Sequence, residues 1–273
     1  MTLSLSGPLL LVGAGKMGGA LLAGWLRQGL DPKSIYVQDP APPADIATLL
    51  ASHGILAEAN ARPPEAPAVM VMAVKPQNMD AVLASLAPHI GPETVVLSIA
   101  AGRTLASLAA HVPKGTAIVR AMPNTPASIG RGMTVACANP SVSRDQALRC
   151  MMLLEAVGEV IFIDDEGLMD AVTAVSGSGP AYVFLLAECL AEAGEDAGLP
   201  PELAARLARE TVAGAGELLH RSELSPAELR RNVTSPKGVT AEALEVLMGK
   251  DGLAHLMKRA VKKAAKRSRE LSK

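Results

Sequence analysis

Aromatic residues are nearly absent from this sequence: Phe, Trp and Tyr together make up 2% of its 273 residues. The core must therefore consist of Ala, Leu, Val and Met, which favours closely packed helices. The charges are balanced, with 26 basic and 27 acidic side chains, so there is no electrostatic case for a nucleic-acid or membrane partner. Because 49% of the residues are apolar, we expect a folded chain with a sizeable core.

Cysteines are few and lack the spacing of a metal or redox motif. Cys137, Cys150 and Cys189 are an odd number without a CxxC pair, and each lies in an apolar stretch. We therefore interpret them as reduced, buried thiols of a cytosolic protein, and we predict no metal site.

Segments typical of secretion or membrane insertion are also missing. The N-terminus lacks a basic segment followed by a cleavable apolar stretch. The most apolar later run, AYVFLLAECLAEA, carries Glu188 and Glu192 and is expected to fall short of a spanning helix. The sequence thus favours a soluble, cytoplasmic protein.

Short apolar runs alternate with helix-like segments over roughly the first 160 residues. Strands are expected at 8–12, 34–38, 69–74, 94–99, 116–122, 133–138 and 158–163, and helices at 17–28, 44–53 and 143–156. This alternation predicts a doubly wound, mostly parallel sheet with helices on both faces.

Helical periodicity replaces the alternation after Asp164. Helices are expected at 167–197, 201–221, 225–232, 240–249 and 251–271. The sequence therefore predicts an α/β domain, 1–164, followed by an all-α domain, 165–273. Residues 181–193 are so apolar that we expect an obligate partner to cover them.

Three glycines mark a dinucleotide site in the first βα unit. GAGKMG places Gly13, Gly15 and Gly18 in G-x-G-x-x-G register, directly after a strand and at the beginning of a helix. The first glycine makes a tight turn, the second lets a pyrophosphate approach the backbone, and the third allows close helix–strand packing. This position in an α/β domain predicts a Rossmann-type cofactor site.

Asp39 follows the second expected strand, where the adenosine ribose of such a cofactor lies. Its carboxylate would accept hydrogen bonds from ribose hydroxyls and repel a 2′-phosphate, and no Arg is adjacent to it in the sequence. On physical grounds this favours NADH over NADPH, and a simple turn at the end of the strand is the alternative.

Other strand ends carry residues suited to the same edge of the sheet. In AVKPQ, Pro76 ends the strand, and Lys75 either faces the ligand or is simply exposed. The small residues of SIAAG would let a nicotinamide lie against the backbone. MPNTP ends a further strand, where it forms either part of the site or only a rigid turn.

The first helix of the all-α part begins with residues that form helices poorly. Ser176, Gly177, Ser178 and Gly179 precede Pro180, so this segment is either a ligand site or a tight helix crossing. Residues 167–198 contain no Lys, His, Arg or Asn to take a proton from a hydroxyl substrate. Imine reduction demands less, since the nitrogen needs only a positioned hydrogen-bond donor.

A loop rich in hydroxyl groups, NVTSPKGVTAEAL, interrupts the later helices. Pro236 and Gly238 would end one helix, and the amides of Gly238, Val239 and Thr240 would converge before the next one as an anion site. A capped turn between helices explains Thr240 equally well. Beside a dinucleotide domain, a small carboxylate substrate is the better explanation.

The segments GAGKMG, AVKPQ, MPNTP, AVSGSGPAY and NVTSPKGVT, in this order and spacing, resemble those of the pyrroline-5-carboxylate reductase family. The resemblance covers essentially the whole chain. It implies a Rossmann domain followed by an all-α C-terminal dimerisation domain. It also implies hydride transfer from NADPH or NADH to the imine carbon of 1-pyrroline-5-carboxylate, which gives L-proline in the last step of proline biosynthesis.

The resemblance also implies site residues. The implied cofactor contacts are Gly13, Ala14, Gly15, Lys16, Met17, Gly18, Asp39, Asn60, Ala73, Val74, Lys75, Pro76, Ala100, Ala101 and Asn232. The implied substrate-binding residues are Ser176, Ser178, Ser235, Gly238, Val239 and Thr240, with Thr240 as the catalytic donor to the ring nitrogen. The implied assembly is a homodimer through the helical domain, and a decamer of dimers is left open.

Lys237 departs from the family's Gly-Gly after Ser-Pro. If this position needs a positive φ, a Lys there costs roughly 1 kcal/mol, and alternatively its charge adds to the carboxylate site. Two rival functions are a reductase of another small imine or hydroxy acid, and a non-catalytic dinucleotide-binding sensor.

Overall fold

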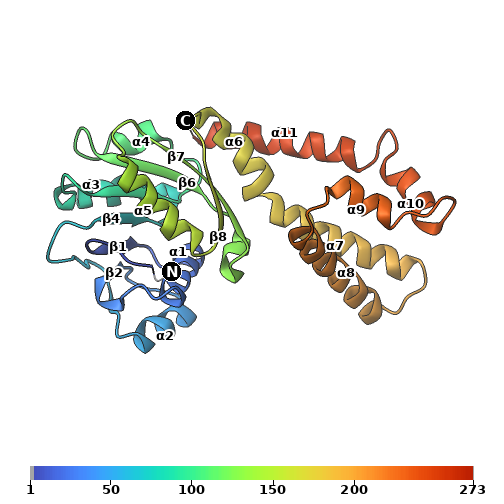
Figure 1. Cartoon of the computed structure of the whole chain (residues 1–273), viewed down its shortest axis with the longest axis horizontal. Helices are drawn as coiled ribbons and strands as arrows, with labels where there is room; N and C mark the ends of the chain where they lie inside the picture. The colour runs from blue at the N-terminus through green and yellow to red at the C-terminus, as the bar shows by residue number, and fades with distance from the viewer. Residues whose placement is uncertain (1–2, 273) are drawn as a thin grey trace. The chain divides into compact units, whose positions relative to one another are not determined.

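The computed structural model describes residues 3–272, and Figure 1 shows their arrangement. The chain forms two compact units. One contains the residues up to Gly177 together with those from Ala265 onwards, and the other contains Ser178–Ala264. The last strand ends at Phe162, and the domain ranges 1–164 and 165–273 stay a prediction.

One mixed sheet forms the centre of the first unit. Its strands among the described residues are β1 (Leu9–Val12), β2 (Ile35–Gln38), β3 (Ala57–Glu58), β4 (Val69–Met72), β5 (Val95–Ser98), β6 (Ala117–Met122), β7 (Gly132–Ala138) and β8 (Gly158–Phe162). They lie in the order β3-β2-β1-β4-β5-β6-β7-β8, and every neighbouring pair is parallel except β6–β7. The predicted doubly wound, mostly parallel sheet is confirmed.

Helices cover both faces of this sheet (Figure 1). They are α1 (Lys16–Arg27), α2 (Ala44–Ser52), α3 (Met79–Leu86), α4 (Leu105–Ala109), α5 (Arg144–Glu155) and α6 (Met169–Val172). Leu9 and Leu11 of β1 pack in the core beneath α1, α2 and α5, whereas Leu10 and Val12 pack beneath α3 and α4. Because successive side chains of a strand point to opposite faces, a strand covered on both sides is apolar throughout.

The second unit is helical. Its helices are α7 (Gly179–Asp196), α8 (Pro201–Arg221), α9 (Pro226–Asn232), α10 (Val239–Leu247) and most of α11 (Leu253–Leu271). α7 packs against α8, where Ala204 and Ala208 are buried and a side chain at Gly194 would lie 3.3 Å from the Ala204 Cβ. Small residues thus allow the two helices to approach closely.

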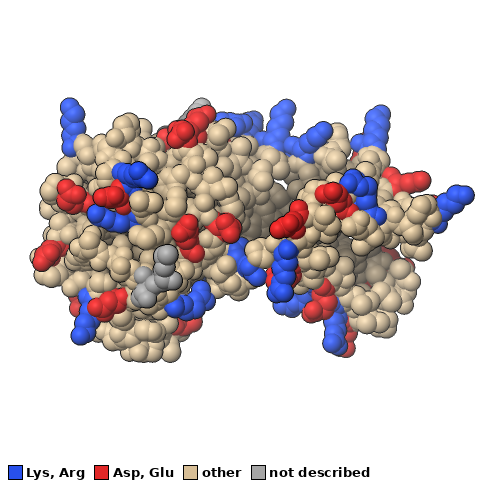
Figure 2. Space-filling view, in the orientation of Figure 1, with Lys and Arg blue, Asp and Glu red and all other residues tan. Residues whose placement is uncertain are grey.

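The outer face of α7 is apolar and exposed within the single chain. Its large exposed side chains are Val183, Phe184, Leu185, Leu186 and Leu190. An exposed apolar face of this size marks a surface that another molecule covers. By contrast, Figure 2 shows acidic and basic side chains interspersed over the visible face of the molecule.

The helical stretch Glu166–Asp196 is long and apolar enough, by length and composition, to cross a membrane. The prediction that this run falls short of a spanning helix is therefore wrong. The reason is that the apolar stretch extends to the N-terminal side of Glu188, through the small residues that precede α7. A helix buried at the centre of a protein assembly has the same composition. Length and composition alone therefore do not distinguish a membrane-spanning helix from a buried one.

All three cysteines are free, as predicted, but they are not all buried. Burial raises the pKa of the Cys150 thiol to about 12. Burial, reinforced by the nearby Glu166 carboxylate and opposed by Arg120, raises the pKa of Cys137 to about 11. The prediction of burial is wrong for Cys189, which lies on α7 and is exposed because no other part of the chain covers it.

Candidate active site

The three glycines after β1 have the backbone and the space that a dinucleotide requires. Gly13 has a φ of 92°, and a side chain there would lie 2.8 Å from the Ala73 carbonyl oxygen. A side chain at Gly18 would collide with the Gly13 carbonyl, so the third glycine allows α1 to pack against the strand. Among residues 3–272, apart from its neighbours in the chain, no atom lies within 4 Å of a Cβ placed at Gly15, which leaves the room that a pyrophosphate needs. These residues therefore fit a dinucleotide.

Asp39 is tied to the glycine loop. Its Oδ2 accepts a hydrogen bond from the Ala14 N–H at 2.7 Å, and its Oδ1 accepts one from the Ala41 N–H at 2.9 Å. The adjacent strand end is fixed by the Gly13 N–H, which donates to the Gln38 carbonyl at 2.9 Å. Asp39 thus supports the loop in addition to any contact with a ribose.

The other predicted cofactor residues of the first unit follow strands at the carboxyl edge of the sheet. Asn60 follows β3, Ala73–Pro76 follow β4, and Ala100 and Ala101 follow β5. The Ala73 N–H donates to the Val12 carbonyl at 2.8 Å, so the end of β4 lies beside the glycine loop. Lys75 is exposed and precedes a 3-10 turn that begins at Pro76. Open α/β sheets bind their ligands at this edge.

Two motifs that are far apart in the sequence meet through Asn124. Its Nδ2 donates to the Ser176 carbonyl and hydroxyl oxygens, both at 3.3 Å, and its Oδ1 accepts from the Met133 N–H at 2.9 Å. Residues Thr173–Gly177 form a π-helical turn, and a side chain at Gly177 would collide with Met122. This segment therefore packs against β6 and holds Ser176 beside a polar neighbour, and the choice between a ligand site and a tight helix crossing stays a prediction.

Pro180 marks the interruption of the helix expected over 167–197, because α6 ends at Val172, a π-helical turn covers Thr173–Gly177 and α7 begins at Gly179. It lies in the first turn of α7, where its missing N–H is tolerated because first-turn amides have no partner within the helix. The π-helical turn before it takes up the change of geometry. Ser178 is the residue that directly precedes α7.

The hydroxyl-rich loop lies in the second unit, between α9 and α10. The Gly238 N–H donates to the Ser235 carbonyl at 3.0 Å, and a side chain at Gly238 would collide with the Ser235 hydroxyl oxygen. α10 begins at Val239, so the N–H groups of Val239 and Thr240 point out of its first turn. Lys237 has a φ of 59°, so this position does require the left-handed backbone. Asn232 is the last residue of α9 and is exposed.

Sequence reasoning missed Arg62. Its Nη1 donates to the Gln38 side-chain oxygen at 2.9 Å and to the Ala61 carbonyl at 2.8 Å, which places a guanidinium beside the end of β2. In the sequence, Arg62 stands 23 positions after Asp39, in an irregular segment without a motif. Only the pairing of β3 beside β2 would have brought the two together.

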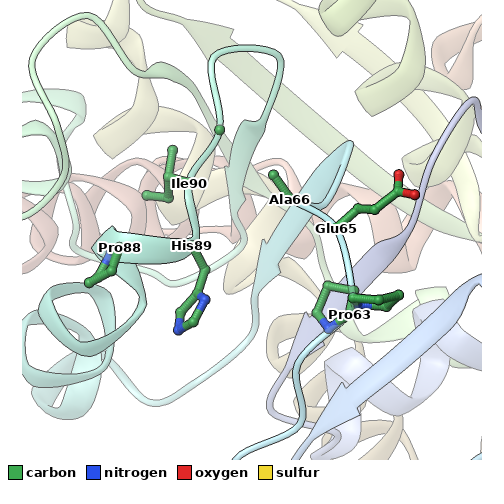
Figure 3. A pocket seen from close by; sticks show the side chains of 8 residues that line it. Pro63, Glu65, Ala66, Pro88, His89 and Ile90 are labelled. Carbon is green, nitrogen blue, oxygen red and sulfur yellow. The ribbon is translucent and has the colours of Figure 1, made fainter.

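A separate hollow lies at the amino ends of β4 and β5, opposite the carboxyl edge that carries the predicted cofactor residues (Figure 3). It is lined by Pro63–Ala66, which lead into β4, and by Pro88–Gly91, which lead towards β5. These segments lie at the amino ends of the strands, away from the edge at which α/β sheets bind cofactors. The hollow therefore takes no part in the candidate site.

Comparison with known proteins decides the family. The family model "Pyrroline-5-carboxylate reductase dimerisation" matches residues 166–271, and the model "NADP oxidoreductase coenzyme F420-dependent" matches residues 9–102. Pyrroline-5-carboxylate reductase from Pseudomonas aeruginosa is 43% identical over 96% of this chain and 95% of its own length. This chain belongs to the pyrroline-5-carboxylate reductase family. The predicted resemblance and enzyme class, an NAD(P)H-dependent oxidoreductase, are confirmed.

Solved structures of the family share the fold. A pyrroline-5-carboxylate reductase from Coxiella burnetii is 34% identical and has a TM-score of 0.88 over 98% of this chain and all of its own. The reductase from Plasmodium falciparum, solved with NADP bound, is 29% identical and has a TM-score of 0.79 over 98% of this chain and 99% of its own. The match to the dimerisation model also supports the expected oligomer and a small-molecule substrate.

Proposed function

We propose that this chain reduces 1-pyrroline-5-carboxylate to L-proline, the last step of proline biosynthesis, and that the residues of its two units divide the work. The first unit holds NADPH or NADH along the glycine loop and the ends of β2, β4 and β5. The second unit holds the substrate on the loop before α10. The observation that carries this assignment is the loop itself, with two outward N–H groups and a Thr hydroxyl at the beginning of one helix.

The substrate carboxylate is assigned to the beginning of α10. The first N–H groups of a helix have no acceptor within it, and the helix dipole favours an anion there. Because the Gly238 N–H already bonds to Ser235, the donors assigned to the carboxylate are those of Val239 and Thr240. The Ser235 hydroxyl, close beside Gly238, adds a donor.

Thr240 is assigned as the hydrogen-bond donor to the ring nitrogen. When bound, the reduced nicotinamide supplies a hydride to the imine carbon. The nitrogen gains electron density as the C=N bond is reduced, so a donor there stabilises the transition state more than the ground state. Residues 167–198 contain no Lys or His, so this hydroxyl meets the modest demand of an imine without a strong base.

Lys237 is assigned to the same carboxylate site. Its backbone adopts a conformation that favours glycine, at a cost of about 1 kcal/mol. An ammonium next to the two N–H donors would add attraction for the substrate anion. Glu242, in the first turn of α10, opposes it with one negative charge.

Ser176 and Ser178 are assigned to the wall of the substrate pocket. Ser176 is already held by Asn124, whose other side-chain atom bonds to Met133. An anchored hydroxyl costs less entropy when a substrate binds. Asn124 thereby becomes a positioning residue for Ser176.

The assembly is assigned as a homodimer in the cytoplasm. The exposed apolar side chains of α7 lie within the residues that match the dimerisation model, and a second copy of this chain would remove them from water. We further propose that these dimers assemble into a larger ring.

Replacement of Thr240 tests the assignment of the donor. We expect Thr240→Ala to lower kcat by about 100-fold while the Kd of the nicotinamide cofactor stays near that of the wild type. Thr240→Ser keeps the hydroxyl and is the matched control, for which most of the kcat should return. An unchanged kcat in Thr240→Ala would remove Thr240 from the mechanism.

A further inference from the structure

Arg62 lies at the corner of the sheet where the adenosine half of a dinucleotide binds. It follows β3, the edge strand, and its Nη1 reaches across to the side chain of Gln38, the last residue of β2. Asp39, the next residue, marks the ribose position of the dinucleotide fingerprint. The guanidinium is therefore held next to the ribose position by neutral groups, Gln38 Oε1 and the Ala61 carbonyl.

The charge of Arg62 is not neutralised by a carboxylate. Among residues 3–272, the ion pairs do not include Arg62. Arg62 shares a hollow beside β2 and β3 with Glu58 and Lys33, and the described ion pairs include none between Arg62 and the Glu58 carboxylate. A guanidinium has five N–H donors in a planar fork, and the two acceptors described use only Nη1. Donors thus remain for an external anion, in a half-buried position that strengthens electrostatic attraction.

The carboxylate of Asp39, which would repel a phosphate, is partly compensated. Each of its oxygens accepts a backbone N–H, from Ala14 and from Ala41. These two hydrogen bonds stabilise its negative charge from two sides, through Ala14 in the glycine loop and Ala41 before α2. The repulsion between the Asp39 carboxylate and a 2′-phosphate is therefore weaker than the sequence alone suggests.

We propose that Arg62 binds the 2′-phosphate of NADPH and sets the preference of this enzyme for NADPH over NADH. The proposal rests on the proposed function, in which the first unit holds the dinucleotide. Arg matches the geometry of a phosphate with two parallel N–H donors, and an Arg near the ribose position is how dinucleotide-binding domains accommodate the 2′-phosphate. Gln38 is the positioning residue that holds the guanidinium at this corner.

Direct binding measurements on purified Arg62→Gln test this role. We expect the Kd for NADPH, measured by nicotinamide fluorescence, to rise about 10- to 100-fold, as for the loss of charge-assisted hydrogen bonds. The Kd for NADH should stay within about twofold, because NADH has no group for Arg62 to hold. The same selectivity should appear in competition by 2′-AMP against 5′-AMP. Equal weakening of both dinucleotides, or no change in either, would overturn the proposal.

Two further variants separate recognition from general effects. Arg62→Lys keeps a charge but lacks the planar fork, so its NADPH affinity should fall between those of the wild type and Arg62→Gln. Lys33→Gln removes the other cation of the hollow and should leave the NADPH affinity within about twofold of the wild type. A loss in Lys33→Gln equal to that in Arg62→Gln would mean diffuse attraction and overturn the assignment. If the wild type bound NADPH selectively but failed to reduce 1-pyrroline-5-carboxylate, the proposed function would fail while the Arg62 assignment stood.

Discussion

Neighbouring residues in the loop before α10 show how sequence and backbone geometry are matched. Lys237 has a φ of 59°, whereas Gly238 has a φ of −85°, which any residue adopts. Gly238 is required for a different reason, since a side chain there would collide with Ser235. The strained position thus carries a charged side chain, and strained backbone conformations cluster at functional sites.

Lys237→Gly should therefore separate stability from binding. We expect the free energy of unfolding to rise by about 1 kcal/mol, seen as a higher Tm, because glycine adopts this backbone without strain. The KM for the substrate should rise about two- to fivefold through the lost charge. A lower Tm would contradict the claim that Lys237 strains the backbone. An unchanged KM would contradict the claim that its charge attracts the substrate.

At this scale, sequence alone predicted what depends on local chemistry. The space and turn requirements of Gly13, Gly15 and Gly18 follow from spacing, and all three are as expected. Asp39 was expected to face a ribose, but its hydrogen bonds to Ala14 and Ala41 depend on how the loop closes over it. No sequence pattern indicated a role for Arg62, because its partner Gln38 is 24 positions away, at the end of β2.

At the scale of elements, α1 is held in place by close contacts near its C-terminal end. Trp25, the single tryptophan of the chain, is fully buried and donates from Nε1 to the Leu153 carbonyl at 2.8 Å. At the preceding residue, a side chain at Gly24 would lie 2.8 Å from both the Ala156 carbonyl oxygen and a methyl group of Val157. The C-terminal part of α1 is thus fixed against α5 and the two residues that link α5 to β8.

Gly24→Ala should destabilise the protein although alanine is the better helix former. Helix propensity alone predicts a gain of about 1 kcal/mol, whereas overpacking against the backbone predicts a loss of about 1–3 kcal/mol. Denaturant unfolding decides by the sign of the change. Gly24→Val should lose more than Gly24→Ala, and a stabilised Gly24→Ala would show that this contact has room to spare.

Long, periodic elements were predictable, and short or irregular ones were not. α8 occupies Pro201–Arg221, as expected from its periodicity, and α10 begins at Val239, one residue from the expected start. β3 was missed because two residues, Ala57 and Glu58, carry no hydrophobic pattern. The π-helical turn at Thr173–Gly177 lies against Met122 at its last residue, and no local pattern reveals it.

At the scale of the whole molecule, the apolar face of α7 demands a second chain. Phe184 is 60% exposed in the single chain, within the residues that match the dimerisation model. In the sequence, alternating strands give way to helices after Asp164, and the last strand of the structure ends close to this point, at Phe162. The compact units nevertheless divide after Gly177, and both contain part of the last helix. The sequence could not predict this sharing, because no local pattern marks the residues near the end of the chain that pack with the first unit.

Phe184→Asp should break the oligomer. A carboxylate buried in an apolar interface without a partner is costly, so light scattering should show a smaller species with reduced activity. Leu148→Asp, on α5 and 46% exposed, is the matched control and should keep the native mass. If Phe184→Asp kept the wild-type mass, this face of α7 would not be the interface.

The most direct measurement is the steady-state oxidation of NADPH and of NADH by the purified chain with 1-pyrroline-5-carboxylate, with L-proline quantified in the same samples. We predict that both reduced cofactors support turnover, that one L-proline forms for each cofactor oxidised, and that NADPH has the higher kcat/KM. Tight cofactor binding without any L-proline formed would contradict the central claim that this chain is a pyrroline-5-carboxylate reductase.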